Sequence, residues 1–350
     1  MRKENIVRRV AAIDGKGQFV VIEQPIPEPR RGQVLIEVAA SLISPGTELG
    51  GIPNRRKSPS NAAPTPFGYQ NAGIVIKLGE GVARFKLGDR VACMGGGYAL
   101  HASHAVAPVN LTVPIPDGVS FEEAAFCHLA ATALHAVRRA EPAFGENFAV
   151  SGLGVVGQLC VQFAKLSGTH VVGLDRFPKR LEVAKATGAD AAFDVAEGDP
   201  VPKVVEFCRG HGLDAGIIAF GGEGTQAAMQ LYEMMKPAPD THRWGRIVVV
   251  GGVTATLHLA AGLGNVDIRS SARPGPGYHD DAWEHGADYP PVFVRWTTQR
   301  NLEESLRAIA EGTLRVKPLI SDVFPLDEAP AACEKLVSTP GEALGVILKP

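Results

Sequence analysis

The sequence predicts an α/β fold in which a doubly wound parallel sheet follows a small β-rich domain, and three observations predict it. Residues 147–175 read as an apolar strand, a glycine turn, a helix and a second strand that ends on Asp175. Strand-like and helix-like segments then alternate as far as Val250, which is typical of a parallel sheet covered by helices. Between Arg9 and Leu111, short β-like runs are separated by Gly and Pro, which favours a small barrel or sandwich.

Length and composition limit the class of protein. At roughly 100 to 200 residues per domain, 350 residues suggest two domains. The 35 basic and 37 acidic residues give a net charge of -2, so charge predicts neither nucleic acid nor a membrane as partner. The five cysteines are scattered and never spaced C-x-x-C, which favours a reducing compartment. The N-terminus lacks a long apolar stretch, and we expect a cytoplasmic protein.

The elements follow in chain order. The first domain contains the strand-like runs VVIEQP, VLIEVAASLI, AGIVIKLG, DRVACM and HAVAP, with an irregular loop expected over residues 44–66. Ser120 and Glu123 form a capping box that opens a helix carrying His128, Thr132 and His135 on one side. The later expected helices cover 179–187, 201–209, 225–236, 298–312 and 326–337. The later expected strands cover 191–194, 214–220, 246–250, a segment near Val316, and 345–348, and we place the late strands with the N-terminal domain.

The glycine turn after the strand at 147–151 predicts a dinucleotide site. Gly152 permits the tight turn, Gly154 lets the backbone approach a pyrophosphate, and Gly157 lets the helix pack close to the strand. The phosphates then lie at the helix N-terminus. Two later turns, at Phe220–Gly221 and Gly251–Gly252, either face the same ligand or are ordinary strand-to-helix turns. The expected cofactor residues are Gly152, Gly154, Val155, Val156, Gly157, Asp175, Arg176, Arg180, Phe220, Gly221, Gly251 and Gly252.

The residue at the end of the second strand predicts the type of dinucleotide. Asp175 lies 23 residues after Gly152, close to the roughly 20 expected for an acid that accepts hydrogen bonds from a ribose. A carboxylate there favours NAD, because it repels the 2'-phosphate of NADP. Arg176 and Arg180 oppose this preference, since either can reach a phosphate.

The segment from Arg273 to Pro291 is rich in Gly, Pro and aromatic residues and is long for a loop inside a compact domain. We expect it to shape a substrate pocket, together with Arg295 and Trp296 after it. The alternative is a contact between subunits. Arg295 can donate two parallel hydrogen bonds to an oxygen-rich or anionic substrate.

Over nearly its whole length the sequence resembles the medium-chain dehydrogenase/reductase superfamily. The motifs are VLIEVAASLISPGTE, FGYQNAGIVIKLGEGVARFKLGDRV, PIPDGVSFEEAA and VSGLGVVGQLCVQFAK followed by VVGLD. The resemblance implies a GroES-like β-barrel catalytic domain at 1–128 and 292–350 and a Rossmann NAD-binding domain at 129–291, with the active site in the cleft. It also implies a small-molecule substrate and a homodimer or homotetramer.

The departures from the family pattern concern zinc. In the zinc alcohol dehydrogenases of this superfamily, ligands stand at the positions that are here Pro45, Tyr69 and His128, and the cysteine-rich lobe between Cys93 and Tyr98 is missing. The sequence is closest to a zinc-free branch with SPGTE and VRWTTQRN motifs, related to threonine and polyol dehydrogenases. We therefore expect no metal, although a site rebuilt from His128, Glu48 and a nearby histidine is the competing interpretation.

The candidate catalytic residues are Thr47, Tyr69 and His128. The resemblance implies that Thr47 and Tyr69 hold a substrate oxygen while His128, titrating near neutrality, is the base; each also has a structural interpretation, as a turn cap, barrel core and helix core. Thr132 matches a position beside the nicotinamide, and its alternative is helix packing. Glu48 is either a support for the site or a salt-bridged loop acid, while His101 and His104 are expected to be structural.

The resemblance implies an NAD-dependent oxidoreductase that transfers hydride between nicotinamide and a secondary alcohol or ketone, of polyol or sugar type, without zinc. Two alternatives stay open. One is an NADPH-dependent quinone or enoyl reductase, which needs no zinc. The other is a non-catalytic dinucleotide-binding protein, as some lens crystallins of this superfamily are.

Overall fold

The computed structural model describes residues 7–350 and divides into two compact units, each described by itself. The first unit contains the described residues up to Ala131, together with Pro274–Gly312 and Ile320–Pro350, and the second contains Thr132–Arg273 and Thr313–Leu319. The charged N-terminal stretch at 1–6 lies outside the described residues. The sequence predicts residues 274–291 in the dinucleotide-binding domain and residues 313–319 in the catalytic domain, whereas the structure joins the former to the first unit and the latter to the second.

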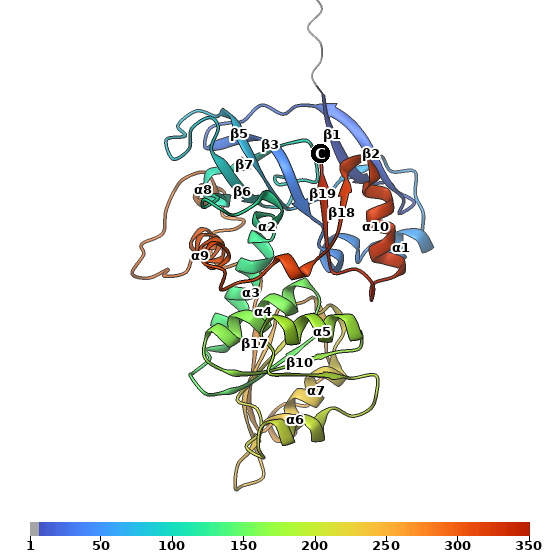
Figure 1. Ribbon diagram of the computed structural model, residues 1–350, viewed down its shortest axis with the longest axis vertical. Coiled ribbons are helices and arrows are strands. Elements are labelled where there is room, and N and C mark those ends of the chain that lie inside the picture. Colours follow the sequence, from blue (N-terminus) through green and yellow to red (C-terminus); the bar gives the residue numbers. More distant parts are fainter. Residues whose placement is uncertain (1–6) are drawn as a thin grey trace, which may run out of the picture. The chain divides into compact units, whose positions relative to one another are not determined.

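Two sheets, antiparallel except for the pair β18 and β19, form the first unit (Figure 1). The larger has the order β18-β19-β3-β5-β6-β8, with β7 also paired with β3, and the smaller has the order β2-β1-β4. A bridge between Val10 and Ala102 connects them. The strands are β1 (Val7–Ile13), β2 (Phe19–Pro25), β3 (Gln33–Leu42), β4 (Thr65–Pro66), β5 (Gln70–Leu78), β6 (Arg90–Met94), β7 (His104–Pro108), β8 (Thr112–Pro114), β18 (Ile320–Pro325) and β19 (Gly345–Lys349).

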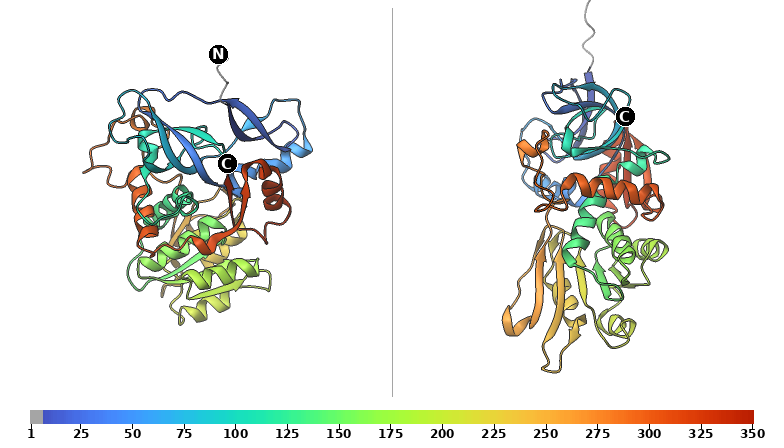
Figure 2. Two further views of the ribbon diagram at one scale, coloured as in Figure 1. Left: turned by 45° about the horizontal axis from the view of Figure 1, so that its top comes forward. Right: turned by 90° about the vertical axis from the view of Figure 1, so that its left-hand side faces the viewer.

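The C-terminal strands complete the larger sheet, as expected from the sequence. β19 pairs antiparallel with β3, at Ile347 opposite Leu42, and β18 pairs parallel with β19. Figure 2 shows the helix α10 (Ala329–Ser338) beside β2, against which it packs. The strand predicted near Val316 is wrong: a 3-10 turn covers Lys317–Leu319, where Pro318 has no N–H to donate to a sheet, and β18 begins after it.

The other helices of the first unit are short or lie late in the chain. They are α1 (Ile52–Lys57), α2 (Phe121–Ala124), α8 (Asp281–Glu284) and α9 (Thr298–Ala310). The capping box is confirmed, because the Ser120 hydroxyl accepts from the Glu123 N–H at 3.2 Å and the Glu123 carboxylate accepts from the Ser120 N–H at 3.1 Å. It caps only α2, however, since the helix that carries His128 begins separately at Cys127. The irregular loop expected at 44–66 is partly ordered by a π-helical turn, η1 (Pro45–Leu49), and by α1.

The second unit has a six-stranded parallel sheet in the order β11-β10-β9-β12-β15-β17, with β14 paired antiparallel to β15. The strand order reverses between β9 and β12, the point at which open α/β sheets bind ligands. Its strands are β9 (Asn147–Ser151), β10 (His170–Asp175), β11 (Ala191–Asp194), β12 (Ala215–Ile218), β14 (Lys236–Pro237), β15 (Arg243–Val249) and β17 (Asn265–Ser270). Its helices, some visible in Figure 1, are α4 (Val155–Leu166), α5 (Pro178–Thr187), α6 (Val201–Phe207) and α7 (Thr225–Met234), while α3 (Cys127–Ala140) contributes to both units.

The sequence did not predict β17. Four of its six residues, NVDIRS, are polar, and four of the six are exposed. β17 pairs only along one side, with β15, among the strands of the described residues. An edge strand needs no apolar run, so its sequence carries a weak signal.

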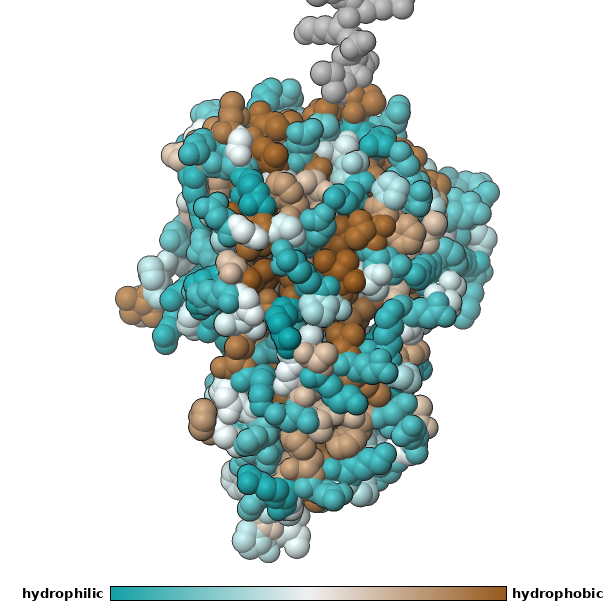
Figure 3. All heavy atoms as spheres, viewed as in Figure 1, coloured by the Kyte–Doolittle hydropathy of each residue, from teal (hydrophilic) through white to brown (hydrophobic). Residues whose placement is uncertain are grey.

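All five cysteines are buried and free, and they are distributed over both units: Cys93, Cys127, Cys160, Cys208 and Cys333. On the face shown in Figure 3, hydrophobic patches lie between hydrophilic ones over the β-rich unit. Within residues 7–350, no helix is long and apolar enough to cross a membrane.

Candidate functional site

The glycine turn between β9 and α4 has the shape of a phosphate-binding turn. Gly152 adopts φ +90°, and a Cβ on Gly157 would lie 1.8 Å from the Gly152 carbonyl oxygen, so both positions require glycine. A Cβ on Gly154 would meet its nearest atom, a nitrogen of Arg180, only at 4.0 Å. Within the described chain no side chain caps α4, which leaves its first N–H groups for an anion. This turn fits a dinucleotide pyrophosphate.

Asp175 connects the turn to the end of β10. One carboxylate oxygen, Oδ2, accepts from the Leu153 N–H at 2.6 Å, and the other, Oδ1, accepts from the Phe177 N–H at 3.0 Å. A guanidinium nitrogen of Arg180 lies 3.7 Å from Oδ2, and the Asp175 side chain is 5% exposed. Both Arg180 and Arg176 lie over the ring of Phe177. The acid therefore shapes the turn itself, with one positive charge directly beside it.

The two later glycine turns lie side by side. The Gly222 N–H donates to the Gly252 carbonyl at 2.9 Å, at the start of the two-residue strands β13 (Gly222–Glu223) and β16 (Val253–Thr254). A Cβ on Gly251 would lie 1.8 Å from the Phe220 carbonyl oxygen, and a Cβ on Gly152 would lie 2.8 Å from the Phe220 ring. Phe220 therefore packs against both turns, and the structure brings the predicted turn residues of the second unit together.

Tyr69 and His128 meet in the first unit. Their ring centroids are 4.8 Å apart, and the side chains of Ser44 and Thr47 lie near the Tyr69 hydroxyl. Tyr69 is half-buried, whereas Thr47 is exposed. Burial raises the pKa of Tyr69 above its ordinary value, and the charge of Glu48 raises it further. Tyr69 is therefore a neutral phenol at pH 7, and the structure brings all three candidate catalytic residues, Thr47, Tyr69 and His128, into one cluster.

His128 differs from the expectation. Burial lowers its pKa to about 3, so the prediction of a base titrating near neutrality is wrong. Its Nδ1 lies 3.2 Å from the thioether sulfur of Met94. Because a thioether sulfur can only accept, this contact assigns the proton to Nδ1 and the lone pair to Nε2. Thr132 follows one turn later on α3, in the second unit.

Glu48 and His101 form a buried pair beside this cluster. The side chains are 3% and 0% exposed, and Glu48 Oε2 lies 3.1 Å from His101 Nε2. The same oxygen accepts from the Ser44 N–H at 2.7 Å, while His101 Nδ1 lies 2.9 Å from the Ser41 hydroxyl. The sequence predicts Glu48 to be a supporting or salt-bridged residue, and its carboxylate contacts the buried imidazole of His101. No motif in the sequence indicates that His101, 53 residues away, is its partner.

The loop 273–291 places Tyr278 near His128. The Gly96 N–H donates to the Tyr278 hydroxyl oxygen at 2.7 Å, and the rings of Tyr278 and His128 are edge to face with centroids 6.5 Å apart. Sequence reasoning selected this loop but missed Tyr278. The only available signal was its aromatic content. Arg295 is exposed and stacks over Trp296 at 5.2 Å rather than over the Tyr69–His128 pair.

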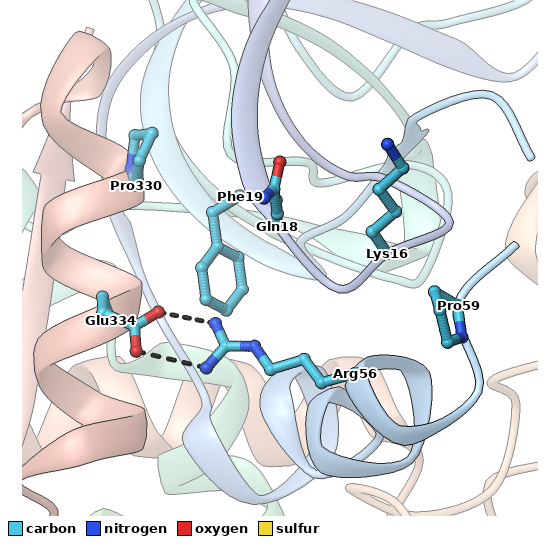
Figure 4. Close-up of a pocket in the computed structure, with 7 residues that line it drawn as sticks. All are labelled: Lys16, Gln18, Phe19, Arg56, Pro59, Pro330 and Glu334. Atoms are coloured by element: carbon cyan, nitrogen blue, oxygen red, sulfur yellow. Dashed lines mark hydrogen bonds and ion pairs between the residues drawn. The ribbon is translucent and has the colours of Figure 1, made fainter. Parts of the chain in front are cut away.

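A cavity of about 710 Å³ lies elsewhere in the first unit (Figure 4). Arg56 and Glu334 form a two-pronged ion pair across it, next to the ring of Phe19. It is lined by Lys16, Gln18, Phe19, Arg56, Pro59, Pro330 and Glu334. None of these is a predicted site residue, so this cavity is separate from the candidate site.

Fold and turn together define the class: a GroES-like domain joined to a Rossmann domain with a dinucleotide turn. The alcohol dehydrogenase GroES-like domain model matches residues 30–117, and the zinc-binding dehydrogenase model matches residues 155–285. The chain belongs to the medium-chain dehydrogenase/reductase superfamily and is an oxidoreductase of the alcohol and sorbitol dehydrogenase type.

Relatives match over nearly the whole chain. Sorbitol dehydrogenase of Bacillus subtilis strain 168 is 26% identical and covers 98% of this chain and 97% of its own length. An alcohol dehydrogenase from Thermus sp. ATN1 has a TM-score of 0.78 at 23% identity, covering 97% of this chain and 99% of that one. A zinc-binding dehydrogenase of Sinorhizobium meliloti 1021, solved with NADP, has a TM-score of 0.77 at 21% identity, covering 99% and 100%.

The residues present do not fit the zinc that this family commonly holds. Pro45 offers no donor atom, and the neutral phenol of Tyr69 is a poor ligand. Within residues 7–350, no group of three His, Cys, Asp or Glu side chains could hold a metal ion. This also applies to the alternative site around His128, Glu48 and a nearby histidine, which form no such group among the described residues.

Proposed function

We propose that this protein is an NAD-dependent dehydrogenase that interconverts a secondary alcohol and its ketone, of polyol or sugar type, without catalytic zinc. The observation that carries the proposal is the contact between Tyr69 and His128, which occupy two of the family's zinc-ligand positions and have ring centroids 4.8 Å apart. Sorbitol dehydrogenases among the relatives support the substrate class.

In this proposal the nicotinamide accepts or returns the hydride, and the protein's residues bind and orient the substrate. Tyr69 and Thr47 hold the substrate oxygen by hydrogen bonds. His128, neutral at pH 7, supports the ring of Tyr69 and offers the lone pair of Nε2 to a hydroxyl group. Arg295, Trp296 and Glu48 belong to the substrate side of the site, and Thr132 to the nicotinamide side.

The preference for NAD comes from Asp175 beside the glycine turn. A hydrogen bond between a ribose hydroxyl and a carboxylate contributes about 1.5 to 3 kcal/mol, or roughly tenfold or more in affinity. Arg180 partly neutralises this acid, so we expect discrimination to be modest. The reduced, buried thiols favour the cytoplasm, and the family favours a homodimer or homotetramer.

Two measurements test the proposal. Calorimetry should show tighter binding of NADH than of NADPH, and equal or tighter binding of NADPH would contradict the NAD assignment. A screen of sorbitol, 2,3-butanediol and related polyols with NAD should give turnover. Turnover of a quinone or enone with NADPH, and of no alcohol, would favour the reductase alternative, and binding without any turnover would favour a non-catalytic protein.

A further inference from the structure

Tyr278 is the residue through which the loop 273–291 meets the candidate site. Its ring lies edge to face with the ring of His128, with centroids 6.5 Å apart, and the His128 ring in turn lies 4.8 Å from that of Tyr69. Tyr69 and Tyr278 are half-buried, whereas His128 is only 8% exposed. The accessible surface of this aromatic cluster therefore comes mainly from the two tyrosines, one directly before β5 and one in the loop.

A short glycine turn positions the Tyr278 hydroxyl. The Gly96 N–H donates to the Tyr278 oxygen at 2.7 Å, and a Cβ on Gly96 would lie 3.3 Å from that oxygen. Gly96 belongs to the segment CMGGGY, which stands where the zinc enzymes of the family carry their cysteine-rich lobe. The loop 273–291 therefore contacts the first unit at a segment where this chain departs from those enzymes.

The backbone that follows Tyr278 is held in a conformation that few residues adopt. His279 has φ +74°, and its ring stacks on that of Tyr278 with centroids 3.9 Å apart. Its N–H donates to the Glu284 carboxylate at 2.7 Å, and Glu284 is 3% exposed. A positive φ at a non-glycine residue persists only where the surroundings enforce it, and such residues are frequent at ligand sites. The fold therefore holds the Tyr278 ring in place before a substrate binds.

A fixed aromatic surface beside hydroxyl groups suits one kind of substrate. An aromatic ring packs against C–H groups, and a few polar groups around such a surface fix the orientation of a ligand. A cyclic polyol or a sugar ring presents C–H groups on its face and hydroxyl groups around its rim. An open-chain polyol has no fixed face and loses more conformational freedom when it binds. The arrangement therefore favours a ring.

We propose that Tyr278 is a specificity-determining residue, whose ring packs against the C–H face of a cyclic polyol or a sugar ring while Tyr69 and Thr47 hold the reacting oxygen. This inference rests on the proposed function and narrows its substrate class from polyols and sugars in general to ring-shaped ones. It adds no step to the reaction.

Matched variants test the contact through KM, measured with the best cyclic and the best open-chain alcohol of the screen. Tyr278→Leu, which removes the aromatic face, should raise KM for the cyclic substrate by about three- to tenfold. Its kcat, its NADH affinity and its KM for the open-chain substrate should stay at wild-type values. Tyr278→Phe keeps the face and should keep the low KM. Tyr232→Leu, at a half-buried tyrosine of α7, is the control and should match wild type.

A purely structural role for Tyr278 predicts a different pattern. If its hydroxyl only anchors the loop to Gly96, Tyr278→Phe and Tyr278→Leu both lose the anchor and should raise KM equally for both substrates. That result would overturn the proposal. Wild-type KM values for Tyr278→Leu with the cyclic substrate would overturn it as well.

A binding measurement separates this proposal from the proposed function. A fluorinated tyrosine at position 278 reports a ligand on its ring through fluorine NMR. With NADH bound, at least one inositol stereoisomer should shift this resonance at concentrations at which sorbitol, with the same number of carbon atoms and hydroxyl groups, does not. Turnover of alcohols without such a shift would overturn this inference and leave the proposed function standing. A shift by an inositol without turnover of any alcohol would support the contact and reject the proposed function.

Discussion

At the scale of single residues, the site depends on which buried groups carry charge. His128 is the clearest case, since its Nδ1 faces a sulfur and burial lowers its pKa to about 3. A neutral buried imidazole can position a ring or a hydroxyl group, but it is a weak base at pH 7. The sequence shows a histidine at a ligand position, whereas only the packing around it determines its protonation.

This protonation state predicts a pH dependence of stability. The unfolded chain binds a proton at His128 below about pH 6.5, whereas the folded protein does not until about pH 3. The free energy of unfolding should therefore fall as pH decreases from 6.5 towards 3, by at most about 1.4 kcal/mol per pH unit from this residue. Urea unfolding at pH 7, 6 and 5 measures the slope. His128→Gln should have a smaller slope, and equal slopes would show that the imidazole is protonated in the folded state.

At the scale of elements, the glycine turn was predictable because each of its glycines is required by its immediate surroundings or by the expected ligand. The structure separates these reasons into two kinds. Gly157 is needed by the fold, because its Cβ would collide with the backbone of Gly152. Gly154 has open space around it, so only a bound ligand would require glycine there.

Two alanine variants exploit this difference. Gly157→Ala should lower the free energy of unfolding by about 1 to 3 kcal/mol, as overpacking does. Gly154→Ala should leave stability at the wild-type value and weaken NADH binding by roughly tenfold or more, since its Cβ would occupy the path of the pyrophosphate. Thermal unfolding and calorimetry measure the two effects. Tight NADH binding by Gly154→Ala would place the pyrophosphate elsewhere.

The loop 273–291 was predicted to be functional from its composition, but its placement was not predictable. Its anchors are distant in sequence: the Asn110 side chain donates to the carbonyls of Trp283 and Ala287, at 2.5 and 2.9 Å. Gly277, in the same loop, adopts φ +108°, and a Cβ there would lie 2.5 Å from the Trp283 ring. Such contacts between remote segments leave no periodic signal in the sequence.

Removing the anchor should release the loop. Asn110→Ala loses both hydrogen bonds to the loop, worth about 0.5 to 1.5 kcal/mol each, together with the one that its Oδ1 accepts from Gln299. Amide exchange over residues 277–289 should therefore accelerate by about tenfold or more. If Tyr278 lies in the substrate pocket, KM should rise while NADH affinity stays constant. Asn54→Ala, at an exposed position of the same unit, is the control. Unchanged exchange would mean that Trp283 packing alone holds the loop.

At the scale of the whole molecule, the sequence predicted both fold types and the order of almost every element. It misplaced the boundary at 291, because the loop that belongs to the first unit follows directly on the last strand of the second. It missed β17, an edge strand with a polar sequence. Ligand positions were assignable from the motifs, whereas the Glu48–His101 pair depends on the three-dimensional packing of separate segments.

The side chains at the family's zinc-ligand positions predict how the protein responds to chelators. Zinc analysis of the purified protein should give well below one ion per chain, and incubation with EDTA should leave kcat on the alcohol unchanged. The physical reason is that Pro45 and neutral Tyr69 cannot complete a tetrahedral site. Stoichiometric zinc whose removal abolishes turnover would refute the zinc-free mechanism.

Alkylation of the five buried thiols can measure how often the folded protein opens. Burial raises the pKa of Cys93 to about 12 and that of Cys208 to about 11, so the native thiols are almost unreactive towards alkylating reagents. Alkylation therefore proceeds through opened states. Cys160 and Cys208 report the second unit, and the other three report the first. NADH should slow alkylation of the first pair more than that of the other three, because a ligand lowers the population of states that cannot bind it.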